Sequence, residues 1–224
     1  MKRVGVLHTS LVFINVESAI TDLLAELLPD AHVAHFIDSD VLAQVGRDGG
    51  VTSASTSRMV HLAQAAEAAD CDAIFSACSS LGPAIDVARK TVGVPIVKID
   101  DAMMARAVEL GSSVGVLATL PTTMAPSTAL LQHHADEAGK PITIVERVVE
   151  GAFSLLMAGD RAGHDAMVTA AAQDLAREVD VIVCAQASMA ALAPALQEAV
   201  SIPVLSSPRL GVSRLAALVA GLEG

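Results

Sequence analysis

The sequence predicts an α/β protein made of two similar halves, each built on a parallel sheet with flanking helices. Short apolar segments with a strand pattern alternate with longer helical segments along all 224 residues. Midway, the order of motifs starts again: VGVLATLPTT at 114–123 mirrors VGVLHTS at 4–10, and DVIVCAQASM at 180–189 mirrors DAIFSACSSL at 72–81. These spacings indicate a duplicated unit of about 105 residues.

The duplication also suggests where the chain divides. We expect one lobe to comprise residues 1–98 with 208–224, whose last helix closes it, and the other lobe to comprise residues 99–207. No Gly/Ser-rich linker separates the halves, so we expect them to pack face to face. A pseudo-twofold relation between them would create an interdomain cleft.

The individual elements follow from periodicity and from residues that start or stop helices. A polar, glycine-containing stretch at 44–55 predicts a loop that either covers a site or simply connects two elements. Ser53 or Ser55 is expected to cap the helix that follows it. Strands are predicted at 3–7, 32–38, 72–77, 92–100 and 142–148, and the motifs 114–123, 180–189 and 201–207 mirror strand segments of the first half. The predicted helices are 17–28, one ending at about 69, one from about 83, 102–110, 127–138, 164–178 and 211–222.

Composition excludes several classes of function. The formal net charge of −11 argues against nucleic acid or an anionic membrane as partner, and a chain without Trp or Tyr lacks base-stacking platforms. No apolar stretch is long and clean enough to span a bilayer, and we interpret the N-terminal apolar run as a core strand, not a signal peptide. Three cysteines without framework spacing favour a reducing, cytoplasmic setting.

Cys78 is the first candidate for a reactive residue. It ends the buried strand 72–77 and precedes the small turn Ser79-Ser80 and a helix that begins near Pro83. Strand ends of this kind form the ligand-binding edge of open α/β sheets. A helix N-terminus favours a thiolate over a thiol, so we expect Cys78 to be reactive. The alternative is a small cysteine that only fills the end of a strand.

Small polar residues follow the strands at four places, two in each half. Hydroxyl groups and helix N–H groups gathered there would bind a carboxylate without Arg or Lys. Any single Ser or Thr can instead cap a helix, and His8 either assists Cys78 as a base or is a structural histidine. No His cluster has a third ligand, so we expect no metal. The candidates are His8, Ser10, Cys78, Ser79, Ser80, Thr119, Thr122, Thr123, Gln186 and Ser188.

The motifs SACSSLGP, GVLATLPTT and DVIVCAQASMA, together with the duplicated layout, resemble the aspartate/glutamate/hydantoin racemase superfamily over nearly the whole chain. The resemblance implies a cofactor-independent enzyme, without pyridoxal phosphate or metal, in which one Cys from each half works on opposite faces of a carbon beside a carbonyl. Cys78 matches the first of these cysteines, and Thr119, Thr122 and Thr123 match the segment that binds carboxylate oxygen. The resemblance also implies a homo-oligomer.

The second half departs from the family pattern. With Asp180 aligned to Asp72, the position of Cys78 corresponds to Gln186, and Cys184 falls two residues earlier on the same strand face. Either Gln186 occupies the second catalytic position and Cys184 is a core residue, or a shifted register makes Cys184 the second thiol. Gln cannot exchange a proton at neutral pH, but it can donate hydrogen bonds to a developing oxyanion.

Three functions remain open at this point. The first is an isomerase that transfers a proton through Cys78 at the α-carbon of a small carboxylate or a hydantoin-like cyclic amide. The second is a one-cysteine lyase or decarboxylase in which Gln186 replaces the second Cys. The third is a protein without catalytic activity that binds a carboxylate.

Overall fold

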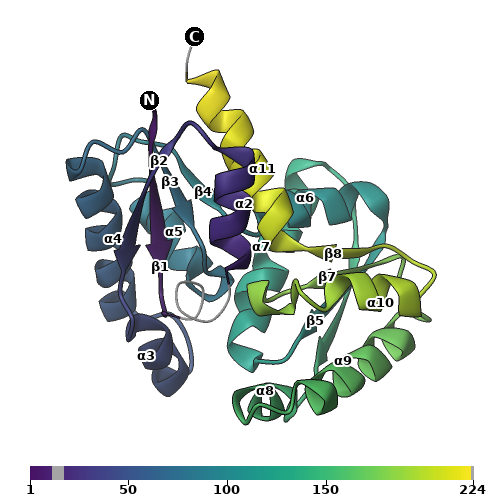
Figure 1. Cartoon of the computed structure of the whole chain (residues 1–224). Coiled ribbons are helices and arrows are strands. Elements are labelled where there is room, and N and C mark those ends of the chain that lie inside the picture. The colour runs from purple at the N-terminus through teal and green to yellow at the C-terminus, as the bar shows by residue number, and fades with distance from the viewer. Residues whose placement is uncertain (12–17, 223–224) are drawn as a thin grey trace. The chain divides into compact units, whose positions relative to one another are not determined.

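The computed structural model describes residues 1–11 and 18–222 of the chain (Figure 1). The chain divides into two compact units, Met1–Asp101 with Pro208–Gly224 and Ala102–Ser207. In the described parts of the chain, no helix is both long enough and apolar enough to cross a membrane.

The first unit is a four-stranded parallel sheet in the order β2-β1-β3-β4. Its central strands β1 and β3 are almost wholly buried, because helices cover both faces: α4 lies along one side, and α2 and α11 lie along the other (Figure 1). The strands are β1 (Arg3–His8), β2 (His32–Ile37), β3 (Ala73–Ser76) and β4 (Ile96–Lys98), and the helices are α2 (Ala19–Leu27), α3 (Val41–Asp48), α4 (Ser53–Ala68), the 3₁₀ turn η1 (Ser79–Leu81), α5 (Gly82–Ala88) and α11 (Ser207–Gly221).

The second unit repeats this plan with the strand order β6-β5-β7-β8, again parallel throughout. Its central strands β5 and β7 are buried in the same way as β1 and β3. The strands are β5 (Ser113–Ala118), β6 (Thr143–Val148), β7 (Val181–Cys184) and β8 (Val204–Ser206), and the helices are α6 (Asp101–Leu110), η2 (Pro121–Thr123), α7 (Met124–Glu137), α8 (Ala152–Met157), α9 (Arg161–Leu175), η3 (Ala187–Met189) and α10 (Ala193–Ala199).

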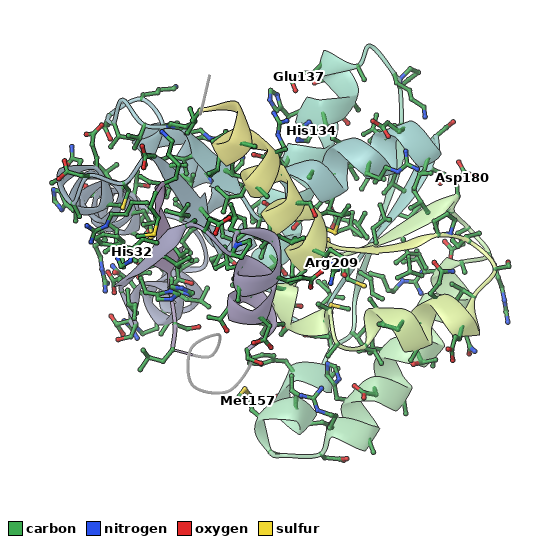
Figure 2. The ribbon with its side chains drawn as sticks, turned by 45° about the horizontal axis from the view of Figure 1, so that its top comes forward. His32, His134, Glu137, Met157, Asp180 and Arg209 are labelled. Atoms are coloured by element: carbon green, nitrogen blue, oxygen red, sulfur yellow. The ribbon has the colours of Figure 1, made fainter. Side chains whose placement is uncertain are left out.

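Residues at equivalent positions have the same structural role in the two units. Gly5 in β1 and Gly115 in β5 each let a helix approach closely: a Cβ would lie 2.9 Å from Ala66 Cβ in the first case and 2.7 Å from Leu175 Cδ2 in the second. Asp72 accepts the backbone N–H of Arg3 at 2.7 Å, and Asp180, labelled in Figure 2, accepts that of Ser113 at 2.9 Å. The predicted fold of two similar parallel α/β halves is therefore confirmed.

Two local predictions were wrong. The stretch 44–55 is not one loop, because α3 runs through its first part with Val41 and Val45 buried one turn apart, and ends at Gly49 with φ of 72°. The cap of α4 is Thr52, whose side chain accepts a hydrogen bond from the Ser55 backbone N–H. The Ser55 side chain in turn accepts from the Thr52 backbone N–H, which completes a capping box.

Other boundaries moved without changing the topology. The predicted helix 17–28 is α2, and Glu17 lies outside the described residues. Helix α8 was not predicted at all, because its six residues are too few for an apolar period to show in the sequence.

Gly211 in α11 gives a test of the packing in the first unit. A Cβ at this position would collide with the backbone carbonyl of Ile99, which cannot rotate away as a side chain can. We expect Gly211→Ala to lower the free energy of unfolding by about 1–3 kcal/mol in urea titrations. The control is Gly46→Ala in α3, where a Cβ meets nothing within 4 Å and stability should hold or rise. Equal stability of Gly211→Ala and wild type would show that α11 does not pack on this segment as described.

Candidate active site

Cys78 lies at the carboxyl edge of the first sheet. It follows β3 in extended conformation, with φ of −137° and ψ of 115°, and directly precedes η1. The residue is partly exposed, whereas the neighbouring Ser79 and Ser80 are buried. The chain thus turns sharply at the end of a buried strand, which leaves the thiol at the edge where parallel α/β sheets bind ligands.

The electrostatic surroundings of Cys78 favour a thiol. Burial raises its pKa, while the Thr9 hydroxyl and the backbone N–H groups of Leu81 and Ser80 act in the opposite direction, and the negative charge of Asp100 raises the pKa further. Loss of hydration thus outweighs the donors at the start of η1, which the sequence predicted to favour the thiolate; the reactivity of Cys78 stays a prediction. Those donors remain in place to stabilise a thiolate once it forms.

His8 ends β1 in the same unit and is only 1 % exposed. Its Nε2 lies 3.0 Å from His35 Nδ1, and burial, together with repulsion from His35, lowers the pKa of His8 to about 4. His8 is consequently neutral at pH 7. Its Nδ1 is buried without a hydrogen-bond partner among the described residues. Ser10, two residues further on, is half-buried.

Two charged residues at the end of β4 were missed by the sequence analysis. Lys98 is 4 % exposed, and its Nζ lies 2.9 Å from Asp86 Oδ1. Asp100 is 2 % exposed, and burial raises its pKa while the Lys98 charge lowers it. The available signal was a Lys inside an apolar strand, followed two residues later by an Asp at a strand end.

Gln186 occupies in the second unit the position that Cys78 occupies in the first. It follows β7 in extended conformation, with φ of −127° and ψ of 134°, and directly precedes η3. Its Oε1 accepts three hydrogen bonds, from Thr119 N at 2.5 Å, Thr119 Oγ1 at 3.0 Å and Leu120 N at 3.1 Å. Backbone N–H groups can only donate, so they fix which end of the amide faces them. The Nε2 group therefore faces away from these donors.

Cys184 does not share this position. It is the last residue of β7, opposite Leu117 of β5 and Ser206 of β8, just as Ser76 of β3 lies opposite Leu7 and Lys98. It is fully buried in the apolar core of the second unit, and burial raises its pKa to about 12. This geometry favours the alternative in which Cys184 is a core residue.

The remaining candidates lie close to these strand ends. Thr119 is buried against Gln186, and Thr123 is buried with its Oγ1 donating to the carbonyl oxygen of Leu120 at 2.7 Å. Thr122 and Ser188 are half-buried. The structure thus brings Ser79 and Ser80 together with Cys78 in one unit, and Thr119 together with Gln186 in the other.

A threonine accompanies each of the two central residues. Thr9 follows β1 and its hydroxyl interacts with Cys78; Thr119 follows β5 and its hydroxyl donates to Gln186. The sequence analysis selected its neighbours His8 and Ser10 but not Thr9. The duplicated fold therefore builds the same polar turn twice, with a thiol in one copy and an amide in the other.

Comparison with known proteins agrees with this architecture. The sequence profile of the family described as Asp/Glu/Hydantoin racemase matches residues 13–215, which is most of the chain. The chain belongs to this family. No curated protein sequence matches it significantly.

Solved structures share the fold at low sequence identity. A glutamate racemase from Francisella tularensis, crystallised with D-glutamate, superposes with a TM-score of 0.76 at 17% identity, over 99% of this chain and 82% of that one. A putative Asp/Glu racemase from Yersinia pestis gives 0.76 at 16%, over 98% and 100% of the two chains. An allantoin racemase from Klebsiella pneumoniae gives 0.68 at 18%, over 100% and 89%.

Selective alkylation tests the contrast between the cysteines. We expect iodoacetamide to modify Cys78 in the folded protein while Cys184 stays unmodified, because Cys184 is fully buried and its pKa is raised to about 12. Since the pKa of Cys78 is also raised, its alkylation should keep accelerating above pH 9. Peptide mass spectrometry after timed labelling measures both sites, and labelling in urea is the control for intrinsic reactivity. Faster modification of Cys184 than of Cys78 would contradict the assignment of the exposed thiol.

Proposed function

We propose that the protein is a cofactor-independent enzyme of the isomerase type, in which Cys78 transfers a proton at one face of the α-carbon of a small carboxylate or hydantoin-like cyclic amide. The single observation that carries the proposal is the equivalence of Cys78 and Gln186 in the duplicated fold. The resemblance implies one thiol from each half at these two positions. This chain has a thiol at one position and an amide at the other. Cys78 can serve only one face of the α-carbon, so net isomerisation requires the proton to return at another atom of the substrate or from solvent at the opposite face.

In this reaction each group has a distinct task. The Cys78 sulfur exchanges a proton with the α-carbon, and the Thr9 hydroxyl with the N–H groups of Ser80 and Leu81 stabilises the sulfur whenever it is charged. The Nε2 group of Gln186 donates to the oxygen that gains charge as the α-carbon becomes planar. That role suits Gln186 because three donors hold its Oε1 and so fix the direction of its amide.

Hydroxyl groups supply the remaining contacts of the substrate. Ser79, Thr122 and Ser188 can donate to carboxylate or carbonyl oxygens without adding positive charge, while the Thr119 hydroxyl proton is donated to Gln186. Neutral donors suffice for a substrate with one carboxylate. Binding through neutral donors is consistent with the formal net charge of −11, because the site does not need Lys or Arg side chains to bind a carboxylate.

A lyase is the second candidate, and the ionisation state of Cys78 favours it. A thiol at rest gives a proton before it takes one, as the final step of a decarboxylation requires. Loss of carbon dioxide from a substituted malonate leaves the electron pair on the α-carbon, where Cys78 would protonate one face. Gln186, which has no proton to exchange, does not compete with it on the other face.

Isotope incorporation tests the proposed reaction. We expect the wild-type protein in deuterium oxide to introduce deuterium at the α-carbon of one member of a panel of α-amino acids, hydantoins and substituted malonates. Mass spectrometry and chiral chromatography of recovered substrate and product distinguish the candidates: exchange with retention supports one-face transfer, and carbon dioxide release supports the lyase. Cys78→Ala should lower the rate by at least about 10²-fold.

Two outcomes would contradict the proposed reaction. Incorporation that persists in Cys78→Ala would remove the thiol from the mechanism. Protection of Cys78 from iodoacetamide by an acid that is never turned over would instead support a carboxylate-binding protein without catalytic activity.

Substitutions at Gln186 and Cys184 test which residue takes the second position. We expect Gln186→Cys to raise racemisation of the recovered substrate, because a second thiol then serves the opposite face. Cys184→Ala should leave turnover nearly unchanged, since it only trims a core side chain, with unfolding measured in parallel to exclude a stability effect. Loss of turnover in a folded Cys184→Ala protein would show that the register is wrong.

A further inference from the structure

Two histidine rings meet on neighbouring strands of the first unit. In the parallel pairing of β1 with β2, His35 lies opposite Val6, and His8 follows Val6 by two residues at the end of β1. Residues two apart on a strand share a face of the sheet, so both rings project to the same side. His8 Nε2 lies 3.0 Å from His35 Nδ1, and the ring centroids are 5.1 Å apart. One hydrogen bond therefore joins the two rings.

The strand pairing itself does not require these histidines. The second unit repeats it, with Val116, the counterpart of Val6, opposite Glu146 of β6. Ala118, which corresponds to His8, is fully buried and has no polar group in its side chain. Burying a polar ring costs free energy, so a pair that the duplicated fold does without is better explained by a role at the strand end than by stability.

The bond between the rings contains a single proton. Burial, together with repulsion from His35, lowers the pKa of His8 to about 4, and partial loss of hydration lowers the pKa of His35 as well. Both rings are consequently neutral at pH 7, and a neutral imidazole has one N–H donor and one acceptor nitrogen. If His35 donates, His8 carries its proton on Nδ1. If His8 donates, its Nδ1 is an unprotonated acceptor.

The difference in exposure between the two rings decides between these arrangements. His8 is 1 % exposed, and its Nδ1 is buried without a hydrogen-bond partner among the described residues. In proteins, buried N–H groups without an acceptor are rarer than acceptors with an unused lone pair. His35 is exposed and lines a cavity of about 350 Å³ between α2 and β2, so water can accept from an N–H on its Nε2. Donation from His8 to His35 leaves no buried N–H unpaired.

We propose that His35 is a positioning residue that holds His8 in the Nε2–H tautomer, so that His8 presents an unprotonated Nδ1 as a hydrogen-bond acceptor at the carboxyl end of β1. His35 does this by accepting the Nε2 proton of His8 with its own Nδ1. The next residue along the chain is Thr9, whose hydroxyl interacts with Cys78. The link between the histidines stands on the geometry of this unit alone.

An unprotonated Nδ1 limits what can bind beside it, because it pairs only with a group that donates a hydrogen bond. Amino acids and hydantoins carry N–H groups, whereas a substituted malonate with ionised carboxylates carries none. The acceptor on His8 therefore favours a substrate with an N–H group. This consequence rests on the proposed function, while the tautomer of His8 does not.

NMR of the full-length protein labelled with ¹⁵N in its seven histidines tests the tautomer without any substrate. Two-bond proton–nitrogen correlations at pH 7 distinguish protonated from unprotonated ring nitrogens, and His8→Gln assigns the His8 signals. We expect the wild-type protein to show His8 with the proton on Nε2 and none on Nδ1. In His35→Ala the His8 signals should move to values averaged over both tautomers, because the acceptor for the Nε2 proton is lost.

Two further variants make this test specific. His35→Asn keeps an oxygen acceptor close to the position of Nδ1 and should restore the wild-type tautomer. The matched control is His32→Ala, at an exposed residue three positions earlier on the opposite face of β2 and labelled in Figure 2, which should leave the His8 signals unchanged. A proton on Nδ1 of His8 in the wild-type protein would overturn the proposal, and so would an unchanged tautomer in folded His35→Ala. If His35→Ala does not fold, the wild-type spectrum alone decides.

Kinetics of the same variants test the consequence for the substrate. For a substrate with an N–H group, His35→Ala should raise KM by about 10-fold, which corresponds to one hydrogen bond, and should change kcat by less than about 2-fold. His32→Ala should change neither. Turnover of malonates alone would contradict the preference for N–H groups, even with the tautomer as proposed. If no member of the panel is turned over, the proposed function fails while the spectrum still decides the role of His35.

Discussion

The chemistry of the second unit depends on three hydrogen bonds to one oxygen. Two backbone N–H groups and one hydroxyl converge on Gln186 Oε1, which is buried at the strand end that corresponds to Cys78. An amide satisfies these donors, and its other end is left to donate. A thiol at this position would leave most of these donors with only a weak acceptor, at a cost of about 1–3 kcal/mol for each buried group left unpaired. The turn around Thr119 is therefore built for an amide.

This constraint makes the two units chemically different at corresponding positions. Both units make the same turn, with a threonine after the first strand and an extended residue before a 3₁₀ turn. The first unit places a thiol there, and two buried charged residues of the same unit, Lys98 and Asp100, lie at and just beyond the end of β4. The second unit places there a neutral donor that is fixed in direction.

The two-unit fold and the equivalence of Cys78 and Gln186 could be predicted from the sequence, because a duplication relates residues that are far apart in the chain. The repeated motifs aligned Asp72 with Asp180, and that alignment alone brought Gln186 to the position of Cys78. The structure agrees, since both aspartates accept backbone N–H groups at the start of a neighbouring strand. Short elements were not predicted. Helix α3 contains Gly46, which suggested a loop, and α8 is too short for its apolar residues to show a period.

The electrostatic errors have a different origin. A helix N-terminus predicted a thiolate at Cys78, but the sequence does not show how completely the site loses water, and burial dominates the pKa. Asp100 was missed for a related reason. It lies just beyond the end of β4, and its burial depends on tertiary packing that local sequence patterns do not determine.

The proposed function requires that Cys78 and Gln186 contact the same ligand. NMR titration of the protein with malonate, a small carboxylate, measures this directly when Cys Cβ and the Gln side-chain amide are both observed, with Gln186→Glu used to assign the amide signal. The account predicts that the Cys78 and Gln186 signals shift together and with one dissociation constant. Shifts in only one of them, or two different constants, would contradict it.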